Sequence, residues 1–361
     1  MDFQSKAVIN LPADFPYEDL CSIAEFLKHA DVFVTGYTPP SVGKYHPDGF
    51  LFGSYFEDLN IILLPDRNIV SRIVQIAKGE ASNHERMIAS AVLAFSQCLD
   101  ILIEPSIAYH ELAPNQGNKA AHEELQWFRA ADDSDASHWI NIGLGRTDRI
   151  FCDIQVKDTE MVNLERPLER WKRNYIVALK IADFELTHMK PVDKVLRLLE
   201  WMFEDFILAG PGIILACVYF APNSPPRAGL FKSLRSSNRA RAIAGVRNAA
   251  WDLTHLSDFV LRSNSASNGN TRYIFASLDA GLRCISELLF RYACDQNQPH
   301  QLAKGLLRWW PVQDAEKIAD FIFKYYGAAR SADWQNKNNE KQSYIDDLIF
   351  LGEAKLNLWS G

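Results

Sequence analysis

The sequence predicts an α/β fold built on a parallel β-sheet, and two apolar runs with their flanking helices are the main observations. The run NIILL at 60–64 is of the kind that forms a strand buried on both faces of a parallel sheet. It passes through PDRN into IVSRIVQIAKG, whose apolar residues fall at helical spacing. A second run, YIFAS at 273–277, leads in the same way into the helical pattern LDAGLRCISELLFRYA. Strands that alternate with helices indicate a parallel sheet.

The rest of the chain is arranged around these two strand–helix segments. The first residues contain a short helix at 17–29 and an apolar strand at 32–35, and the middle of the chain is mostly helical. The final seventy residues are also helical in pattern. We therefore expect an N-terminal extension at 1–57, an α/β domain in two halves at 58–113 and 240–295, a large helical insertion at 114–239, and a C-terminal helical extension at 296–361.

Composition limits the class of protein. Apolar residues make up 48% and charged residues 23% of the chain, which suits a globular protein with a large core. The net charge of −7 gives no bulk attraction to nucleic acid, so any such contact needs a local basic surface. The N-terminus lacks a secretory pattern and no run approaches the roughly 20 apolar residues of a membrane span. We expect a cytoplasmic protein with no membrane partner.

The six cysteines also suit a cytoplasmic protein. None of them lies in a C-x-x-C pair, and most stand in apolar runs such as IILACVYF. Small buried hydrophobic groups are therefore favoured over zinc ligands or disulfides.

Two aspartates follow the two predicted strands at the same kind of position. Asp66 comes two residues after NIILL, and Asp279 follows YIFAS after a short turn. Ligands of open parallel sheets bind outside the carboxyl ends of the strands. This coincidence is the strongest purely physical indication of a functional site.

Two further acids interrupt apolar segments. Glu111 stands at the end of ILIEPSIAYHE, and Asp252 lies within NAAWDLTHLSDF. A charge among core residues is costly unless it is paired or binds a cation. Carboxylates that meet at one point repel each other, and a divalent cation removes the conflict. Oxygen ligands of this kind favour Mg²⁺ or Mn²⁺ over zinc.

Each acid also has an ordinary structural explanation. An aspartate before a helix is a favoured N-cap, which suits both strand-end aspartates. Glu111 could be an exposed residue of a helix end. The remaining open alternatives are that Asp252 pairs with Arg247 or Arg262, and that Glu104 or Asp258 replaces one of the assigned acids.

Taken in order, four segments resemble the motifs of PIN-domain ribonucleases. LLPDRNIVSRI resembles the first motif, an apolar strand followed by Asp-x-Asn and a helix, and IAYHELA is similar to the second. NAAWDLTHLS is similar to the third motif, and YIFASLDAGLRCIS resembles the fourth. The resemblance covers 58–113 and 240–290, which is less than half of the chain.

The resemblance implies a three-layer PIN-like fold with a central parallel sheet, here split by the helical insertion and flanked by extra segments. It implies a metal-dependent endoribonuclease, such as a toxin or defence effector, that uses Mg²⁺ or Mn²⁺ to hydrolyse RNA. Asp66, Glu111, Asp252 and Asp279 would be the metal-binding acids. Asn68 and Ser277 would be supporting polar residues.

A basic stretch at 227–247 precedes the third motif. Six positive charges and no acid occur from 222 to 247, so Arg239, Arg241 and Arg247 are candidates for gripping the phosphate backbone. The same charges would also occur if this stretch were a solvent-exposed loop leading into the start of a helix. His110 and His255 stand near two of the acids and are candidates for acid–base groups, although structural hydrogen bonding is the commoner role of such histidines.

Two other functions remain open. A catalytically silent PIN-like scaffold would use the insertion and the terminal helices to bind a regulatory protein or a second copy of the chain. A structure-specific DNA nuclease would use the same acids on another substrate.

Overall fold

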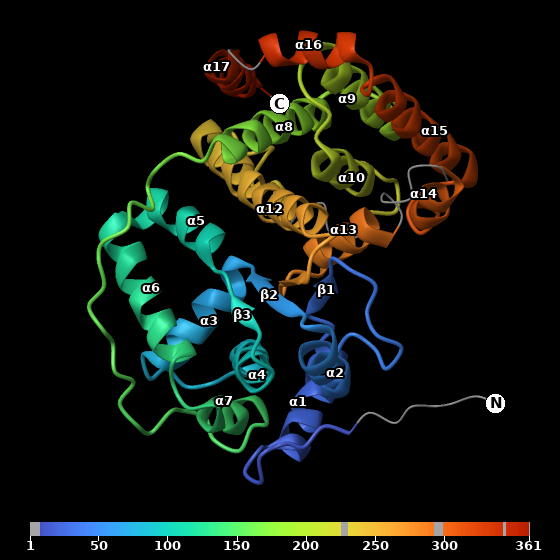
Figure 1. Cartoon of the computed structure of the whole chain (residues 1–361). Helices are drawn as coiled ribbons and strands as arrows, with labels where there is room; N and C mark the ends of the chain where they lie inside the picture. Colours follow the sequence, from blue (N-terminus) through green and yellow to red (C-terminus); the bar gives the residue numbers. More distant parts are fainter. Residues whose placement is uncertain (1–7, 225–229, 292–298, 342–343, 361) are drawn as a thin grey trace, which may run out of the picture. The chain divides into compact units, whose positions relative to one another are not determined.

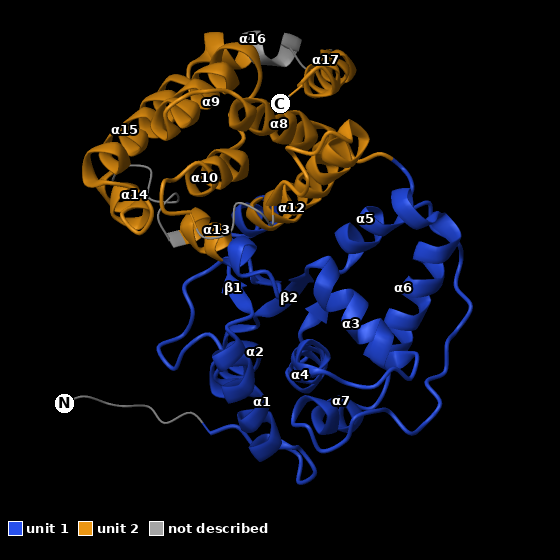
Figure 2. Ribbon diagram, turned by 180° about the vertical axis from the view of Figure 1, so that it is seen from behind, with its two compact units in different colours: residues 1–166, 261–283 blue, residues 167–260, 284–361 orange. Residues whose placement is uncertain are grey.

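The computed structural model describes residues 8–224, 230–291, 299–341 and 344–360, which form an α/β, mostly helical protein (Figure 1). The chain divides into two compact units, drawn in two colours in Figure 2. Unit 1 comprises 1–166 and 261–283, and unit 2 comprises 167–260 and 284–361. This division differs from the grouping of 58–113 with 240–295 that the sequence suggested.

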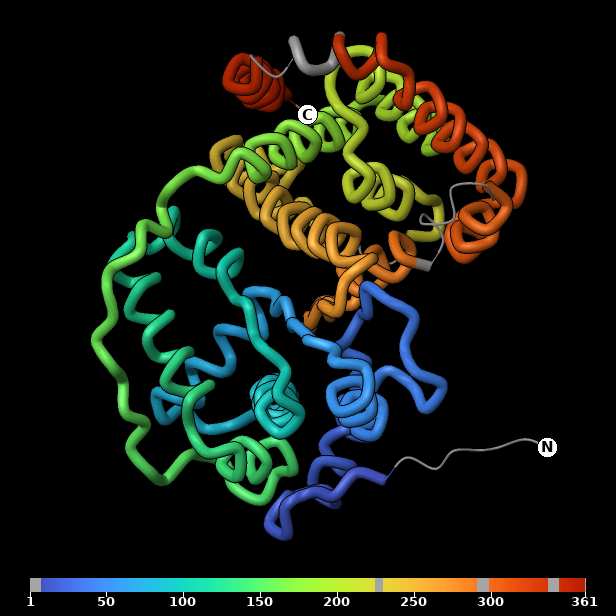
Figure 3. The backbone as a smooth tube through the Cα atoms, viewed as in Figure 1, coloured from blue at the N-terminus to red at the C-terminus, as the bar shows by residue number. Residues whose placement is uncertain are grey.

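Unit 1 contains a four-stranded sheet in the order β1-β4-β2-β3. Its strands are β1 (Phe33–Thr35), β2 (Asn60–Pro65), β3 (Leu102–Ile103) and β4 (Thr271–Ala276). The late strand β4 lies between two early ones, as the orange and blue segments of the tube show (Figure 3). The two apolar runs expected to form strands therefore do so, and they pair with each other in parallel.

The sheet is mixed, so the central parallel sheet expected from the sequence is found in three of its four strands. β2 runs parallel to both β3 and β4, but β1 pairs antiparallel to β4, with Phe33 opposite Ala276. The direction of a strand depends on the connections at its ends and not on its own residues. The short apolar run at 32–35 predicted the strand correctly and carried no information on its direction.

The helices of unit 1 share one hydrophobic core with the sheet. α3 (Arg67–Ala77) and α4 (His84–Cys98) pack against each other and against strands β2 and β3 respectively. α7 packs on α4, and its Trp139 is fully buried. The other helices are α1 (Tyr17–Ala30), α2 (Pro47–Glu57), α5 (Ser106–Gln116), α6 (Asn118–Asp132) and α7 (Ala136–Gly143).

The chain from 144 to 168 contains no helix, although the sequence suggested a mostly helical insertion. This segment runs along α5 and α6, where His110 Nδ1 lies 2.8 Å from the Leu164 oxygen and Asn118 Nδ2 donates to the Val162 oxygen at 3.0 Å. Its residues have few apolar side chains at helical spacing, and Pro167 lies near its end. Hydrogen bonds to the helices replace the missing internal ones.

The regular secondary structure of unit 2 is helical within its described residues. α8 packs against α17, and α9 packs against α15. Two of the three unit boundaries fall inside helices α12 and α13, and the third lies just before α8. Its helices are α8 (Glu169–Leu186), α9 (Pro191–Asp205), α10 (Gly210–Tyr219), α12 (Arg239–Ser265), α13 (Ala280–Arg291), α14 (Pro299–Leu306), α15 (Val312–Ala328), α16 (Ala332–Lys341) and α17 (Ile345–Asn357).

Five cysteines lie in the described part of the chain, and all five are free thiols. Cys217 is fully buried, three are half-buried, and Cys152 is exposed, which departs from the expected burial. Cys294 lies outside the described residues. Within those residues, no helix combines the length and the apolar character needed to cross a membrane.

Candidate functional site

Asp66 lies at the junction between β2 and α3. Pro65 is the last residue of β2, and the backbone nitrogen of Asp66 donates to the Ala276 oxygen at the end of β4 (2.8 Å). The side chain is buried, with 4% of the residue exposed, and it caps the N-terminus of α3. The structure thus confirms the helix-cap explanation of this residue. A cap and a metal ligand are compatible roles, because a carboxylate has about four acceptor positions.

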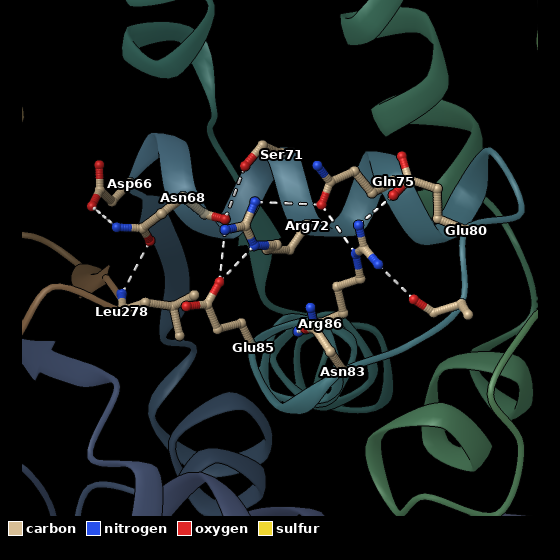
Figure 4. Close-up of polar contacts among 11 residues, drawn as sticks. Asp66, Asn68, Ser71, Arg72, Gln75, Glu80, Asn83, Glu85, Arg86 and Leu278 are labelled. Atoms are coloured by element: carbon tan, nitrogen blue, oxygen red, sulfur yellow. Dashed lines mark hydrogen bonds and ion pairs between the residues drawn. The ribbon is translucent and has the colours of Figure 1, made fainter.

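The carboxylate of Asp66 is held by donors from two segments. It accepts hydrogen bonds from the Arg67 nitrogen (2.6 Å), from Ser277 Oγ (2.7 Å) and from Asn68 Nδ2. Asn68 Oδ1 in turn accepts from the Leu278 nitrogen at 3.0 Å (Figure 4). These bonds satisfy a buried charge and join the β2–α3 junction to the turn after β4. Asn68 and Ser277, predicted as supporting polar residues, lie beside Asp66.

The orientation of α3 is fixed farther along its length. Arg72 donates through Nε and Nη2 to Glu85 Oε2 on α4, at 2.9 and 2.6 Å (Figure 4). Gln75 Oε1 on α3 accepts from Arg86 of α4. The pairing between α3 and α4 holds the helix whose first turn carries Asp66.

Glu111 on α5 lies close to Asp66. The residue is half-buried, and one of its carboxylate oxygens is within 4.8 Å of one of Asp66. Two oxygens bound to one Mg²⁺ at ~2.0–2.1 Å are at most about 4 Å apart, so a small side-chain movement brings both onto one ion. The two charges repel at this spacing, and a divalent cation offsets that repulsion. Unit 1 therefore contains a carboxylate pair whose chemistry fits a hard divalent cation.

Asp279 behaves differently from Asp66. It is exposed, and its Oδ1 accepts from the backbone nitrogens of Gly281 (2.7 Å) and Leu282 (3.0 Å), which caps α13. Its own nitrogen donates to Ser277 Oγ at 2.9 Å. Among the described residues, no close group of three or more candidate metal ligands includes Asp279. The helix-cap explanation is confirmed for this residue as well.

The remaining predicted site residues belong to unit 2. Asp252 is a half-buried residue of α12. Arg247 donates to Glu353 at 2.7 Å and to the Tyr175 hydroxyl at 3.3 Å. Arg239 donates to three backbone oxygens, those of residues 234, 236 and 356, whereas Arg241 is exposed. Two of the three arginines proposed to grip phosphate thus bind other groups of unit 2.

The alternative acids and histidines also have structural partners. Glu104 Oε1 accepts from the Ser106 nitrogen (3.0 Å) at the start of α5, and Asp258 pairs with Arg170 within unit 2. His110 Nδ1 lies 2.8 Å from a backbone oxygen, and His255 is buried on α12.

Two residues near Asp66 had no indication in the sequence. Arg67 forms an ion pair with Glu124 on α6 (2.7 Å), with both side chains less than one fifth exposed. Arg283 donates to the Ser277 backbone oxygen at 2.9 Å. Arg67 and Arg283 stabilise the two segments in which Asp66 and Ser277 lie. Their interactions depend on how the helices pack, which cannot be predicted from the local sequence pattern.

The pKa of Asp132 in unit 1 is shifted by its surroundings. Burial, with a smaller contribution from neighbouring Asp133, raises the pKa of Asp132 to about 6. The folded chain therefore binds a proton more tightly than the unfolded chain, and this contribution to stability is lost as pH rises from about 4 to about 6. We expect Asp132→Asn to raise the free energy of unfolding at pH 7.5 by about 1–2 kcal/mol and to have little effect at pH 3.5.

Urea denaturation at the two pH values measures this effect. Asp133→Asn is the matched control, and we expect a smaller effect because Asp133 is exposed and contributes less than burial to the raised pKa of Asp132. An equal effect of Asp132→Asn at both pH values would contradict the prediction.

Comparison of the chain with protein-family models, with curated proteins and with solved structures found no match.

Proposed function

We propose that the chain is a metal-dependent endoribonuclease with a PIN-like fold, and that Asp66 and Glu111 hold its catalytic cation. The observation that carries the proposal is the close approach of these two carboxylates at the carboxyl end of a central strand. The order of the four acidic motifs in the sequence supports the same reading. RNA is the proposed substrate and Mg²⁺ or Mn²⁺ the proposed cofactor.

Each residue has a defined role in this proposal. A bound cation supplies an activated water and offsets the charge of the scissile phosphate. Asp66 and Glu111 hold the cation, while Ser277 and Asn68 orient the Asp66 carboxylate through their hydrogen bonds. Asp279 and Asp252 enter the proposal through the sequence motifs alone. Hydrolysis of this kind needs no nucleophilic side chain.

Incubation of the purified chain with end-labelled single-stranded RNA and Mn²⁺ tests the proposal. We expect cleavage that stops on addition of a chelator and falls by 10²-fold or more, as an order of magnitude, in Asp66→Asn and in Glu111→Gln. Glu104→Gln is the matched control, because Glu104 lies just before α5 and accepts a hydrogen bond from the Ser106 nitrogen. Intact RNA, or equal cleavage by wild type and Asp66→Asn, would contradict the proposal.

A branched DNA substrate in the same assay separates an RNase from a structure-specific DNA nuclease. Preferential cleavage of the DNA would indicate that DNA, and not RNA, is the substrate of the same acid site.

A second candidate function, a metal-binding scaffold without catalysis, is favoured by one observation. Arg239 and Arg247 bind partners within unit 2, and Asp279 caps a helix, so several residues proposed for substrate and metal have other roles. A scaffold would bind Mn²⁺ through Asp66 and Glu111 and leave every nucleic-acid substrate intact.

A further inference from the structure

A large cavity of unit 1 lies away from the acid pair. Its volume is about 790 Å³, and we call it the α2 pocket because residues of that helix form much of its wall. Ile61 at the start of β2 also lines it. Asp66 follows the other end of the same strand, five residues away, so the acid site is about 16 Å distant. Drug-sized ligands occupy cavities of this size.

The wall of the α2 pocket is rich in aromatic side chains. Tyr17, Tyr37 and Phe50 contribute to it, together with Phe52 and Phe56, whose rings lie 5.1 Å apart. Phe52 and Phe56 are 43% and 51% exposed, which is unusual for phenylalanine. Exposed aromatic side chains that line a cavity indicate a binding surface for a flat apolar group more often than single exposed aromatic side chains elsewhere on the surface.

The more buried polar groups of the pocket are hydrogen-bond donors. Arg272 on β4 is half-buried, and its Nη1 donates to the oxygens of Gly269 (2.6 Å) and Thr271 (2.9 Å), which fixes the guanidinium. Tyr37 follows β1, the strand paired with β4, and has no hydroxyl hydrogen bond within the described residues. Burial raises the pKa of the Tyr37 hydroxyl to about 12, opposed by the charge of Arg272, so the group remains a donor at neutral pH.

The acids of the pocket stand at its exposed edge. Glu57 is exposed at the end of α2, where solvent screens its charge. Asp48 is also exposed, and it accepts a hydrogen bond from the Tyr17 hydroxyl at 2.5 Å. The pocket thus offers one cation whose Nη1 is fixed by two backbone oxygens, and one phenol that can donate a hydrogen bond to a ligand.

We propose that the α2 pocket binds a small aromatic monoanion, with the flat apolar body among the aromatic side chains and a carboxylate on Arg272 and Tyr37. Arginine recognises a carboxylate through its planar donors, and hydrogen bonds to charged groups are stronger than neutral ones. This site is independent of the acid pair and shares no residue with it.

Calorimetric titration of the full chain with naphthoate and with its neutral analogue naphthylmethanol tests the proposal. We expect saturable binding of naphthoate, about tenfold or more tighter than that of the alcohol. Arg272→Leu should weaken naphthoate binding by about tenfold and leave the alcohol unchanged, while Phe56→Ser should weaken both. Tyr37→Phe should weaken only naphthoate, by a smaller factor.

Two control variants separate a specific effect of Arg272 from a general effect of the substitution. Arg149→Leu removes an exposed arginine of the same unit and should leave both affinities unchanged. Arg272→Lys retains the charge and should bind naphthoate more tightly than Arg272→Leu, which excludes misfolding as the cause. The proposal is overturned by equal binding of the two compounds, by wild-type affinity of Arg272→Leu, or by absence of saturable binding. Tighter binding of a nucleoside monophosphate than of naphthoate would also overturn it.

Discussion

Replacement of Asp66 by alanine is expected to lower the free energy of unfolding by about 2–4 kcal/mol, even without a metal ion. Loss of a helix N-cap costs about 0.5–2 kcal/mol, and buried donors left without an acceptor cost about 1–3 kcal/mol. The donors concerned are Ser277 Oγ, Asn68 Nδ2 and the Arg67 nitrogen. Urea denaturation of the metal-free chain measures the change.

Asp279→Ala is the matched control for this variant. It removes the other strand-end aspartate, which also caps a helix but is exposed. We expect it to cost only the capping contribution, about 1 kcal/mol. If the two variants cost the same, the buried network around Asp66 does not stabilise the fold as described.

Replacement of Trp139 by alanine is expected to lower the free energy of unfolding by about 3–5 kcal/mol, which is typical of a large aromatic residue removed from a core. Trp139 on α7 is fully buried, and its Nε1 donates to Ser134 Oγ at 2.8 Å. Loss of the indole leaves a cavity in a region where α7 packs on α4. Urea denaturation followed by circular dichroism detects the change.

An exposed aromatic residue of unit 1 provides the comparison. Phe151 is 82% exposed, so Phe151→Ala should change the free energy of unfolding by less than about 0.5 kcal/mol. A cost below about 1 kcal/mol for Trp139→Ala would contradict the packing of α7 on the core.

The strand–helix segments could be predicted from the sequence because their residues carry the information locally. The apolar run before Asp66 and the one before Ser277 form β2 and β4, and their parallel pairing brings the two polar residues together. α8 and α9 follow from helical periodicity in the same way. The strand-end pattern therefore located the buried aspartate, whereas Asn68 and Ser277 were predicted from the resemblance to PIN-domain ribonucleases.

Other features depend on long-range packing that the local pattern does not contain. The direction of β1 is set by its position beside a strand more than two hundred residues later. The exposure of Asp279 and the burial of Asp66 differ although both follow a strand and cap a helix. The hydrogen bond of Arg239 to the Leu356 oxygen and the ion pair of Arg247 with Glu353 likewise depend on α17, which lies over a hundred residues away.

Calorimetric titration with Mn²⁺ tests the central claim most directly. The account predicts saturable binding by wild type and by Glu104→Gln, and loss of that binding in both Asp66→Asn and Glu111→Gln. Titration of Asp252→Asn and Asp279→Asn shows whether those acids contribute as well. Absence of binding to the wild-type chain, or unchanged binding by Asp66→Asn and Glu111→Gln, would contradict a cation site on these two carboxylates.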